Sequence, residues 1–153
     1  MEIERKFLVR SLPSDLDTCA FHMIEQGYLC TDPVVRVRRE DDSFYMTYKG
    51  KGFLAREEYN LPLTKEAYDH LIQKADGNII TKKRCMIPIE GTSLTIELDI
   101  FEGKFAGTVI AEVEFDSIEE AESFIPPDWF GADVTKDRRY SNSFMSSQHF
   151  DTV

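Results

Sequence analysis

Apolar and charged residues alternate along most of this chain, with the period of two that is typical of a β-strand. Successive side chains of a strand point to opposite faces, so each such segment has one apolar and one charged face. In residues 93–101, for example, Glu97 and Asp99 share one face while leucine and isoleucine share the other. Eight segments follow this pattern, and we predict a strand for each: residues 2–9, 21–29, 34–40, 44–49, 54–63, 79–89, 93–101 and 109–115.

Two segments have helical spacing instead. Thr64 is the predicted cap of a helix over residues 65–75, in which apolar residues recur every three or four positions. A shorter helix is predicted from Ser117 to Phe124. The chain then leads into an amphipathic turn around Phe144 and Met145. Both helices are short relative to the strands, so we expect them to cover the sheet.

Many strands, few helices and short turns predict a mainly β (α+β) fold. The expected architecture is an eight-stranded antiparallel meander closed into a barrel, a tunnel with a few flanking helices. Asp41 and Asp42 form a predicted hairpin turn, and residues 128–131 are predicted as a further turn. The chain of 153 residues is of ordinary domain size, so we expect a single domain over residues 1–153.

Composition narrows the possible functions. A hydrophobic content of 42% excludes disorder, and no apolar run is long enough to cross a membrane. Charged residues stand where a secretory signal needs an apolar core, so we expect a cytoplasmic protein, monomeric or homodimeric. The three cysteines have no close pairing and are predicted to be free thiols. A net charge of −10 argues against nucleic acid as a partner.

The charged faces of the strands allow two interpretations. They could face solvent, as polar faces of antiparallel sheets commonly do, with weak ion pairs between strands. They could instead line the inside of a barrel. The distribution of charge favours the second interpretation, because acids gather on residues 2–9, 93–101 and 109–115, and cations on residues 34–40, 44–49 and 79–89.

Such a cavity has the chemistry of a phosphate site. A triphosphate carries about four negative charges, which arginine and lysine neutralise. Acids cannot contact those phosphates directly, so acid pairs in the same cavity imply divalent cations between them, Mg²⁺ or Mn²⁺ with oxygen ligands. Enzymes of phosphoryl transfer use cationic side chains to bind phosphate and acidic side chains to bind metal ions.

The ordered set of charged residues resembles the CYTH superfamily, the triphosphate tunnel metalloenzymes. The resemblance runs from Met1 to about Asn142 and is carried by Glu2-x-Glu4-x-Lys6, Arg36-x-Arg38, Lys49, Glu58, Lys82-x-Arg84, the segment Glu97 to Gly103, and Glu112-Val-Glu114-Phe115. It implies an eight-stranded tunnel and metal-dependent hydrolysis of tripolyphosphate or of nucleoside or thiamine triphosphates. In one branch it implies cyclisation of ATP.

The resemblance also implies roles for individual residues. The metal-binding acids are Glu2, Glu4, Glu112 and Glu114, and the catalytic residues are Glu2, Glu4 and Lys6. The triphosphate-binding residues are Lys6, Arg36, Arg38, Lys49, Lys82, Arg84 and Lys136. Further candidates are Glu58, Glu97, Asp99, Tyr28 and Arg139.

This chain departs from the family pattern at several positions. Asn60 stands where many members have a second acid, and Tyr28 where some have lysine. Lys136 and Arg139 lie in a stretch similar to the family's T-x-D-x-R-Y-x-N segment. That stretch could instead be a structural plug in which Tyr140 and Asn142 pack.

Three functions follow from these residues. The favoured one is a metal-dependent triphosphatase with two Mg²⁺ or Mn²⁺ ions and a small-molecule triphosphate as substrate. The second is an adenylyl cyclase, in which a ribose hydroxyl replaces water as nucleophile. The third is a polyphosphate-binding module without activity, which would not need the acid pairs that this chain has.

Overall fold

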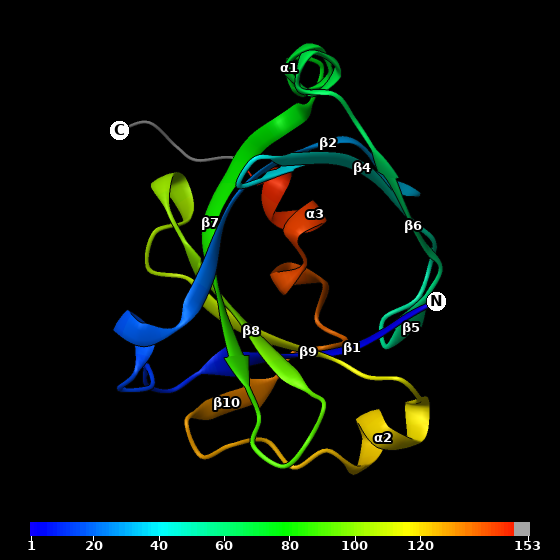
Figure 1. Cartoon of the computed structure of the whole chain (residues 1–153). Coiled ribbons are helices and arrows are strands. Elements are labelled where there is room, and N and C mark those ends of the chain that lie inside the picture. Colours follow the sequence, from blue (N-terminus) through cyan, green and yellow to red (C-terminus); the bar gives the residue numbers. More distant parts are fainter. Residues whose placement is uncertain (149–153) are drawn as a thin grey trace.

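The structure, a computed structural model, describes residues 1–148 (Figure 1). Ten strands form one antiparallel sheet in the order β10-β1-β9-β8-β7-β2-β3-β4-β6, with β5 paired to β1. The strands are β1 (Glu2–Val9), β2 (Ala20–Thr31), β3 (Val34–Glu40), β4 (Ser43–Lys49), β5 (Ala55–Arg56), β6 (Glu58–Pro62), β7 (Asp76–Pro88), β8 (Thr95–Phe101), β9 (Val109–Glu114) and β10 (Phe130–Asp133). The helices are α1 (Lys65–Ile72), α2 (Ile118–Ser123) and α3 (Asn142–Ser146). The predicted fold class, a mainly β barrel, is confirmed.

The sheet curls into a nearly closed barrel, and β5 makes the closure. Glu2 pairs with Arg56 and Ile3 with Ala55, which joins the first strand to the segment that leads into β6. The continuous strand predicted over residues 54–63 is therefore wrong. It is interrupted at Glu57, because the residues before it pair with β1 and the residues after it pair with β4.

A strand that was not predicted, β10, pairs with β1 along the edge opposite β9. Phe7 pairs with Asp133 and Val9 with Phe130, so the turn predicted over residues 128–131 runs into a strand. The rings of Phe7 and Phe130 lie 4.9 Å apart. They belong to an apolar cluster with Leu98 and Val113, which lies between β1, β8 and β9 on one side and β10 and α2 on the other.

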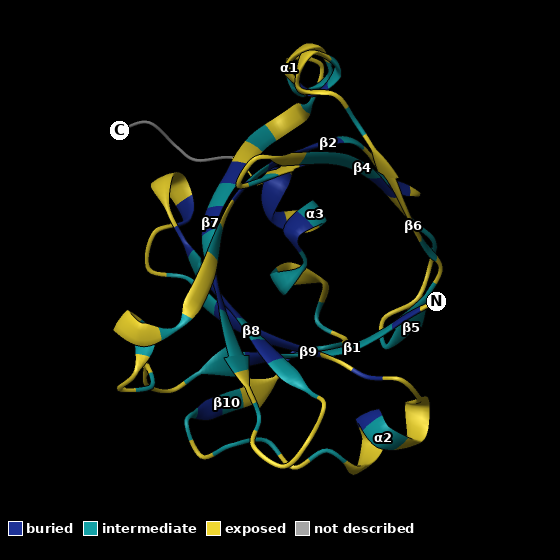
Figure 2. Cartoon of the chain, in the orientation of Figure 1, coloured by how far each residue is buried: buried dark blue, intermediate teal, exposed yellow. Residues whose placement is uncertain are grey.

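Covering the apolar face from outside leaves the charged face of the strands inside the barrel. The buried charged side chains are Glu2, Arg36, Arg38, Lys82, Arg84, Asp99 and Glu112. Figure 2 shows these strands largely in the colours of buried and half-buried residues. The interpretation of a solvated charged face is thus wrong for β1, β3, β7, β8 and β9.

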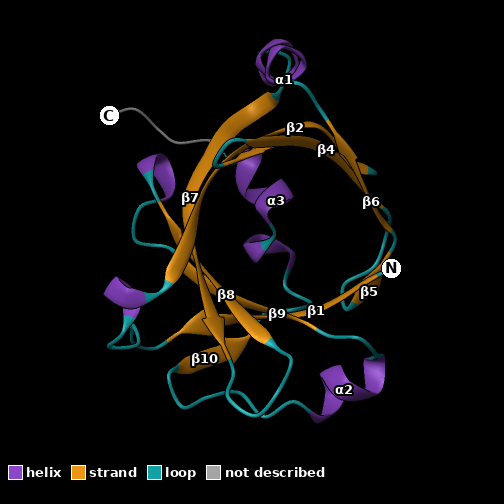
Figure 3. Cartoon of the chain, in the orientation of Figure 1, coloured by secondary structure: helices purple, strands orange, loops and turns teal. Residues whose placement is uncertain are grey.

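The three helices differ in their place relative to the barrel. The predicted helix after Thr64 is confirmed as α1, which lies outside the sheet and is capped by a hydrogen bond from Ala67 N to Thr64 Oγ1 (3.1 Å). The helix predicted after Ser117 is confirmed as α2, also outside. By contrast, α3 lies within the ring of strands (Figure 3). Among the described residues, no helix is both long and apolar enough to cross a membrane.

Close packing between β2 and the segment after α1 gives a stability prediction. A Cβ atom at Gly27 would lie 2.7 Å from Ala75 Cβ and 2.8 Å from Ile72 Cδ1, so Gly27→Ala forces these neighbours apart. We expect the free energy of unfolding to fall by about 1–3 kcal/mol, measured by urea denaturation. Gly50→Ala is the matched control, because its Cβ would lie at an ordinary 3.6 Å from Glu57 Cβ. Equal stability of the two variants would contradict this packing.

Candidate active site

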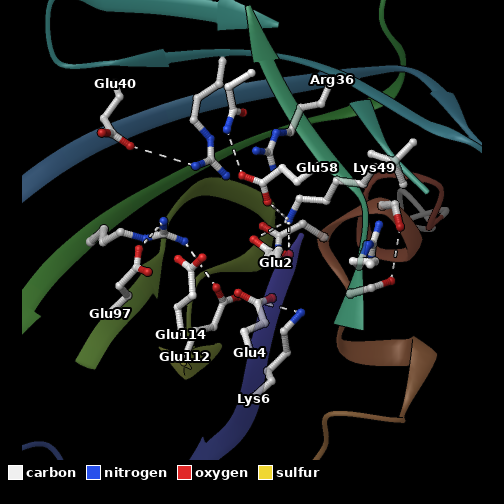
Figure 4. Close-up of a pocket in the computed structure, with 18 of the residues that line it drawn as sticks. Glu2, Glu4, Lys6, Arg36, Glu40, Lys49, Glu58, Glu97, Glu112 and Glu114 are labelled. Carbon is white, nitrogen blue, oxygen red and sulfur yellow. Dashed lines mark hydrogen bonds and ion pairs between the residues drawn. The ribbon is translucent and has the colours of Figure 1, made fainter. Parts of the chain in front are cut away.

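The inward faces of the strands line a cavity of about 380 Å³. Of the residues predicted from the sequence, the cavity is lined by Glu2, Glu4, Lys6, Tyr28, Arg36, Arg38, Lys49, Glu58, Lys82, Arg84, Glu97, Glu112 and Glu114. Figure 4 shows the acids of β1 and β9 pointing toward one another, with arginine and lysine side chains from the other strands around them. Barrel closure thus brings together residues from both ends of the sequence.

A buried carboxylate holds two cations in place. Asp99 has no solvent exposure, and it accepts hydrogen bonds from Arg84 Nε (2.7 Å) and Arg84 Nη2 (2.9 Å). Its other ion pair is with Lys82 Nζ (2.7 Å). Burial alone would raise the pKa of Asp99, but the charges of Arg84 and Lys82 lower it, so the carboxylate stays ionised. Asp99 does not itself line the cavity, so its place is behind the two cations.

The two arginines of β3 are held in different ways. Arg38 donates from Nε to Gln26 Oε1 (2.7 Å) and from Nη1 to the Tyr45 hydroxyl (3.2 Å). Burial and the neighbouring charge of Arg36 lower the pKa of Arg38. Arg36 donates from Nη2 to Thr47 Oγ1 (3.3 Å), while its buried Nε has no hydrogen-bond partner in the described part of the chain. A buried donor without a partner is costly, so Arg36 suits an anion in the cavity.

Lys49 joins two acids at the seam where the barrel closes. Its Nζ lies 3.0 Å from Glu2 Oε1 and 3.5 Å from Glu58 Oε2. Burial, the charge of Glu4 and a hydrogen bond with Glu58 raise the pKa of Glu2 to about 8. Burial alone would raise the pKa of Glu58, but the hydrogen bond with Glu2 and the charge of Lys49 lower it to about 2. The neighbouring carboxyl groups of Glu2 and Glu58 thus have pKa values shifted in opposite directions.

The acids of β1 and β9 crowd one another. The carboxylate of Glu4 forms no hydrogen bond or ion pair with any residue from 1 to 148, and burial and the charge of Glu112 raise its pKa. Glu112 lies 3.7 Å from Lys6 Nζ and 3.5 Å from Arg84 Nη2, and these cations lower its pKa against the effect of burial. Burial and the charge of Glu58 raise the pKa of Glu114.

The donor set fits a hard divalent cation. Glu2, Glu4, Glu112 and Glu114 offer only carboxylate oxygens. Burial and neighbouring acids disfavour the ionised forms of Glu2, Glu4 and Glu114, and a nearby positive charge would favour them. Within residues 1–148, no three acidic, histidine or cysteine side chains are arranged as a complete metal cage. Mg²⁺ commonly uses only one or two carboxylates, with water and substrate phosphates as its other ligands, so a complete protein cage is not needed.

Besides Asp99, two predicted residues do not line this cavity. Lys136 is exposed and lies beside Arg5 and Glu122 in a separate surface hollow. Arg139 is exposed and paired with Asp137 at 2.6 Å. The structure thus corrects the placement of Lys136 with the triphosphate-binding residues: the backbone carrying it follows β10 on the outer side of the barrel.

Several cavity-lining residues were not among the predicted site residues. They are Val34, Glu40, Tyr45, Arg56, Asn60, Ser141, Asn142 and Ser143. Strand alternation carries a signal for some of them, since Glu40 shares a face with Arg38, and Arg56 shares one with Glu58. The family-like T-x-D-x-R-Y-x-N segment includes Asn142 but does not by itself place it in the cavity. Ser141, Asn142 and Ser143 reach the cavity through the entry of the C-terminal segment into the barrel.

Comparison with known proteins agrees with this site. Residues 1–141 match the family model of the CYTH domain. An inorganic triphosphatase of Nitrosomonas europaea is 37% identical over 150 residues, which are 95% of this chain and 96% of the relative. An inorganic triphosphatase of Acetivibrio thermocellus is 38% identical over 154 residues, covering 93% of this chain and 90% of the relative.

A solved structure shares the fold as well. The crystal structure of an inorganic triphosphatase superposes with a TM-score of 0.72 at 33% sequence identity, covering 97% of this chain and 96% of that one. The match extends over nearly the whole barrel, including the strands that carry the charged interior. Family model, relatives and fold agree, and the chain belongs to the CYTH domain family.

Proposed function

We propose that this protein is a divalent-metal-dependent triphosphatase that hydrolyses inorganic tripolyphosphate inside its barrel. Water adds to a terminal phosphorus, the bridging P–O bond breaks, and orthophosphate and pyrophosphate leave. The relatives described as inorganic triphosphatases support this substrate. The largely polar lining supports it too, because among residues 1–148 the cavity has one aliphatic lining residue, Val34, beside the rings of Tyr28 and Tyr45. An adenine or thiamine ring would need more apolar contact.

The observation that carries the proposal is the division of charge within one enclosed cavity. Arg36, Arg38 and Lys82 line the cavity together with Glu2 and Glu4. Figure 4 shows Arg36 on a different part of the wall from Glu2 and Glu4. Cations without acids would suit a simple anion-binding module. Acids crowded so closely that their pKa values rise suit metal ions that bridge them to phosphate.

In this proposal the cationic residues bind and orient the substrate. Arg36 and Arg38 of β3 neutralise phosphate oxygens with planar guanidinium groups, and Lys82 and Arg84 of β7, held by Asp99, do so as well. Lys6 stays charged, since burial lowers its pKa less than Glu112 and Glu4 raise it. It lies between the acids and the cavity, where it can contact a phosphate oxygen.

The acids of β1 and β9 would hold the metal. We propose Glu2, Glu4, Glu112 and Glu114 as ligands of Mg²⁺ or Mn²⁺, two ions in all, and a cytoplasmic setting for the reaction. When bound, the ions supply neutralisation of the phosphate oxygens and activation of the attacking water. The protein contributes a rigid oxygen donor set and a cavity with restricted access to water.

A substrate panel tests this proposal. The protein is incubated with tripolyphosphate, pyrophosphate, ATP and thiamine triphosphate, each with Mg²⁺ and with Mn²⁺, and products are separated by anion-exchange chromatography. We expect orthophosphate and pyrophosphate from tripolyphosphate and little turnover of the others. Cyclic AMP from ATP would show a cyclase instead, and tight binding without any product would show a binding module.

The role of Arg38 can be tested against its neighbour in the strand. Arg38→Ala should weaken tripolyphosphate binding by about 10-fold or more, measured by calorimetry with Ca²⁺, because a charge-assisted hydrogen-bond donor is lost. Arg38→Lys should restore this only partly, since the planar fork is missing. Arg39→Ala is the control, because Arg39 is exposed on the opposite face and donates to Asp41 O. Equal affinity of Arg38→Ala and wild type would exclude this contact.

The raised pKa of Glu4 predicts a pH-dependent stability. Its ordinary pKa is 4.5, and the higher value in the folded protein means that ionisation destabilises the fold as pH rises. Without metal, the melting temperature of Glu4→Gln should therefore equal that of wild type at about pH 4 and exceed it at about pH 8. With Mg²⁺ and tripolyphosphate the order should reverse, and turnover should be lost.

The control for this comparison is Glu57→Gln, which changes an exposed acid of the β5–β6 junction. It should melt as wild type does at both pH values and keep its turnover. If Glu4→Gln melts as wild type does throughout and still hydrolyses tripolyphosphate, Glu4 is neither crowded by other acids nor a metal ligand.

A further inference from the structure

A short chain of hydrogen bonds connects the cationic walls of the cavity through the C-terminal helix. Arg38 Nε donates to Gln26 Oε1 (2.7 Å), and Gln26 Nε2 donates to Asn142 Oδ1 (2.9 Å). Lys82 Nζ donates to the same Asn142 oxygen (3.0 Å). The Asn142 oxygen of α3 is therefore hydrogen-bonded directly to Lys82 of β7. Through Gln26 of β2 it is also linked to Arg38 of β3.

These groups are shielded from solvent, so the loss of any one of these hydrogen bonds is costly. Gln26 is 0% exposed, Lys82 is 1% exposed and Asn142 is 8% exposed. A buried amide or ammonium that loses its acceptor keeps the full cost of desolvation. Asn142 is thus the acceptor on which both Gln26 Nε2 and one N–H of Lys82 depend.

The backbone of α3 is fixed, so the oxygen is presented in one place. Met145 is buried in a cluster with Ile80, Phe101 and Ile110. The carbonyl of Ser146 accepts a hydrogen bond from Asn78 Nδ2 (3.1 Å) at the start of β7. The helix is therefore anchored both by apolar packing and by a polar contact to the barrel wall.

We propose that Asn142 is a positioning residue of the triphosphate site, which aims Lys82 directly and Arg38 through Gln26. An ammonium has three N–H donors, and Asp99 and Asn142 take two from Lys82. Their positions fix the direction of the third, which is free for a phosphate oxygen in the cavity. Gln26 likewise holds Arg38 Nε, which sets the plane of its guanidinium group. This inference rests on the proposed triphosphatase function.

Asn142→Ala is the direct test. We expect KM for tripolyphosphate to rise about 10-fold, with a similar loss of affinity in calorimetry with Ca²⁺, because two cations lose their orientation. The value of kcat should change less, since Asn142 contacts neither the acids nor Lys6. Ser147→Ala is the matched control on the same segment, because its exposed hydroxyl bonds only to Phe144 O.

A double-variant comparison separates positioning from loss of the fold. Gln26→Ala and Asn142→Ala remove members of the same chain of hydrogen bonds, so the double variant should lose little more affinity than the more impaired single variant. Independent effects would multiply the two losses and contradict a shared path to Arg38. Melting temperatures of all variants are measured, and the binding comparison is made well below the lowest of them.

The pH profile gives a readout that a merely structural role would not move. Burial and the charges of Arg84 and Arg38 lower the pKa of Lys82 to about 7. The charges of Asp99 and Glu112 act in the opposite direction and raise it. A hydrogen bond to the ammonium favours its charged form. Removing the acceptor in Asn142→Ala should therefore shift the alkaline limb of log(kcat/KM) to lower pH.

The outcomes separate this inference from the proposed function. Wild-type protein without triphosphate turnover would contradict the proposed function. Wild-type turnover together with an unchanged KM and an unchanged alkaline limb in Asn142→Ala would overturn this inference alone. A raised KM with a shifted limb, and neither change in Ser147→Ala, would support it.

Discussion

The structure depends most on the buried ionic contact of Asp99 with Lys82 and Arg84. Removing one partner of such a contact leaves an uncompensated buried charge and costs about 3–5 kcal/mol. The two cations lie two residues apart on β7, and Asp99 lies directly across on β8, so strand register alone brings the three together. The apolar cluster on the outside of β8 and β9 holds that register. A polyanion site thus exists within the barrel because its cations are already paired and fixed.

The acid side of the cavity is organised differently. The Glu4 carboxylate has no hydrogen-bond or ion-pair partner among residues 1–148, and Glu2 and Glu58 lie together at Lys49 with pKa values shifted in opposite directions. The cationic wall is therefore held by its own counterions, whereas the acidic wall is left under electrostatic repulsion. A metal ion bound to these acids would relieve that repulsion, and metal and substrate would then stabilise the same closed barrel. The closure is made by a two-residue strand, β5, the hydrogen bond from Glu4 N to Leu54 O (3.0 Å) and the Lys49 contacts.

The C-terminal segment changes what kind of barrel this is. With α3 inside the ring of strands, part of the interior is filled by Met145 and its apolar neighbours. The remaining space is bounded by Asn142, whose oxygen accepts from both Gln26 and Lys82. The C-terminal segment therefore packs inside the barrel, as a structural plug would. The hydrogen bonds of Asn142 connect this plug to the charged wall of the cavity.

The sequence by itself determined the strands and the sorting of their charges. The period of two placed Glu97 with Asp99 and Arg36 with Arg38, because alternation is a property of the extended backbone and needs no partner. The distribution of charge favoured the charged face as the inner one, and the tertiary structure confirmed it by covering the apolar face. The break at Glu57, the addition of β10 and the entry of α3 into the barrel were decided only by the tertiary structure. Each depends on pairing or packing between segments far apart in the chain, and local sequence carries no signal for such contacts.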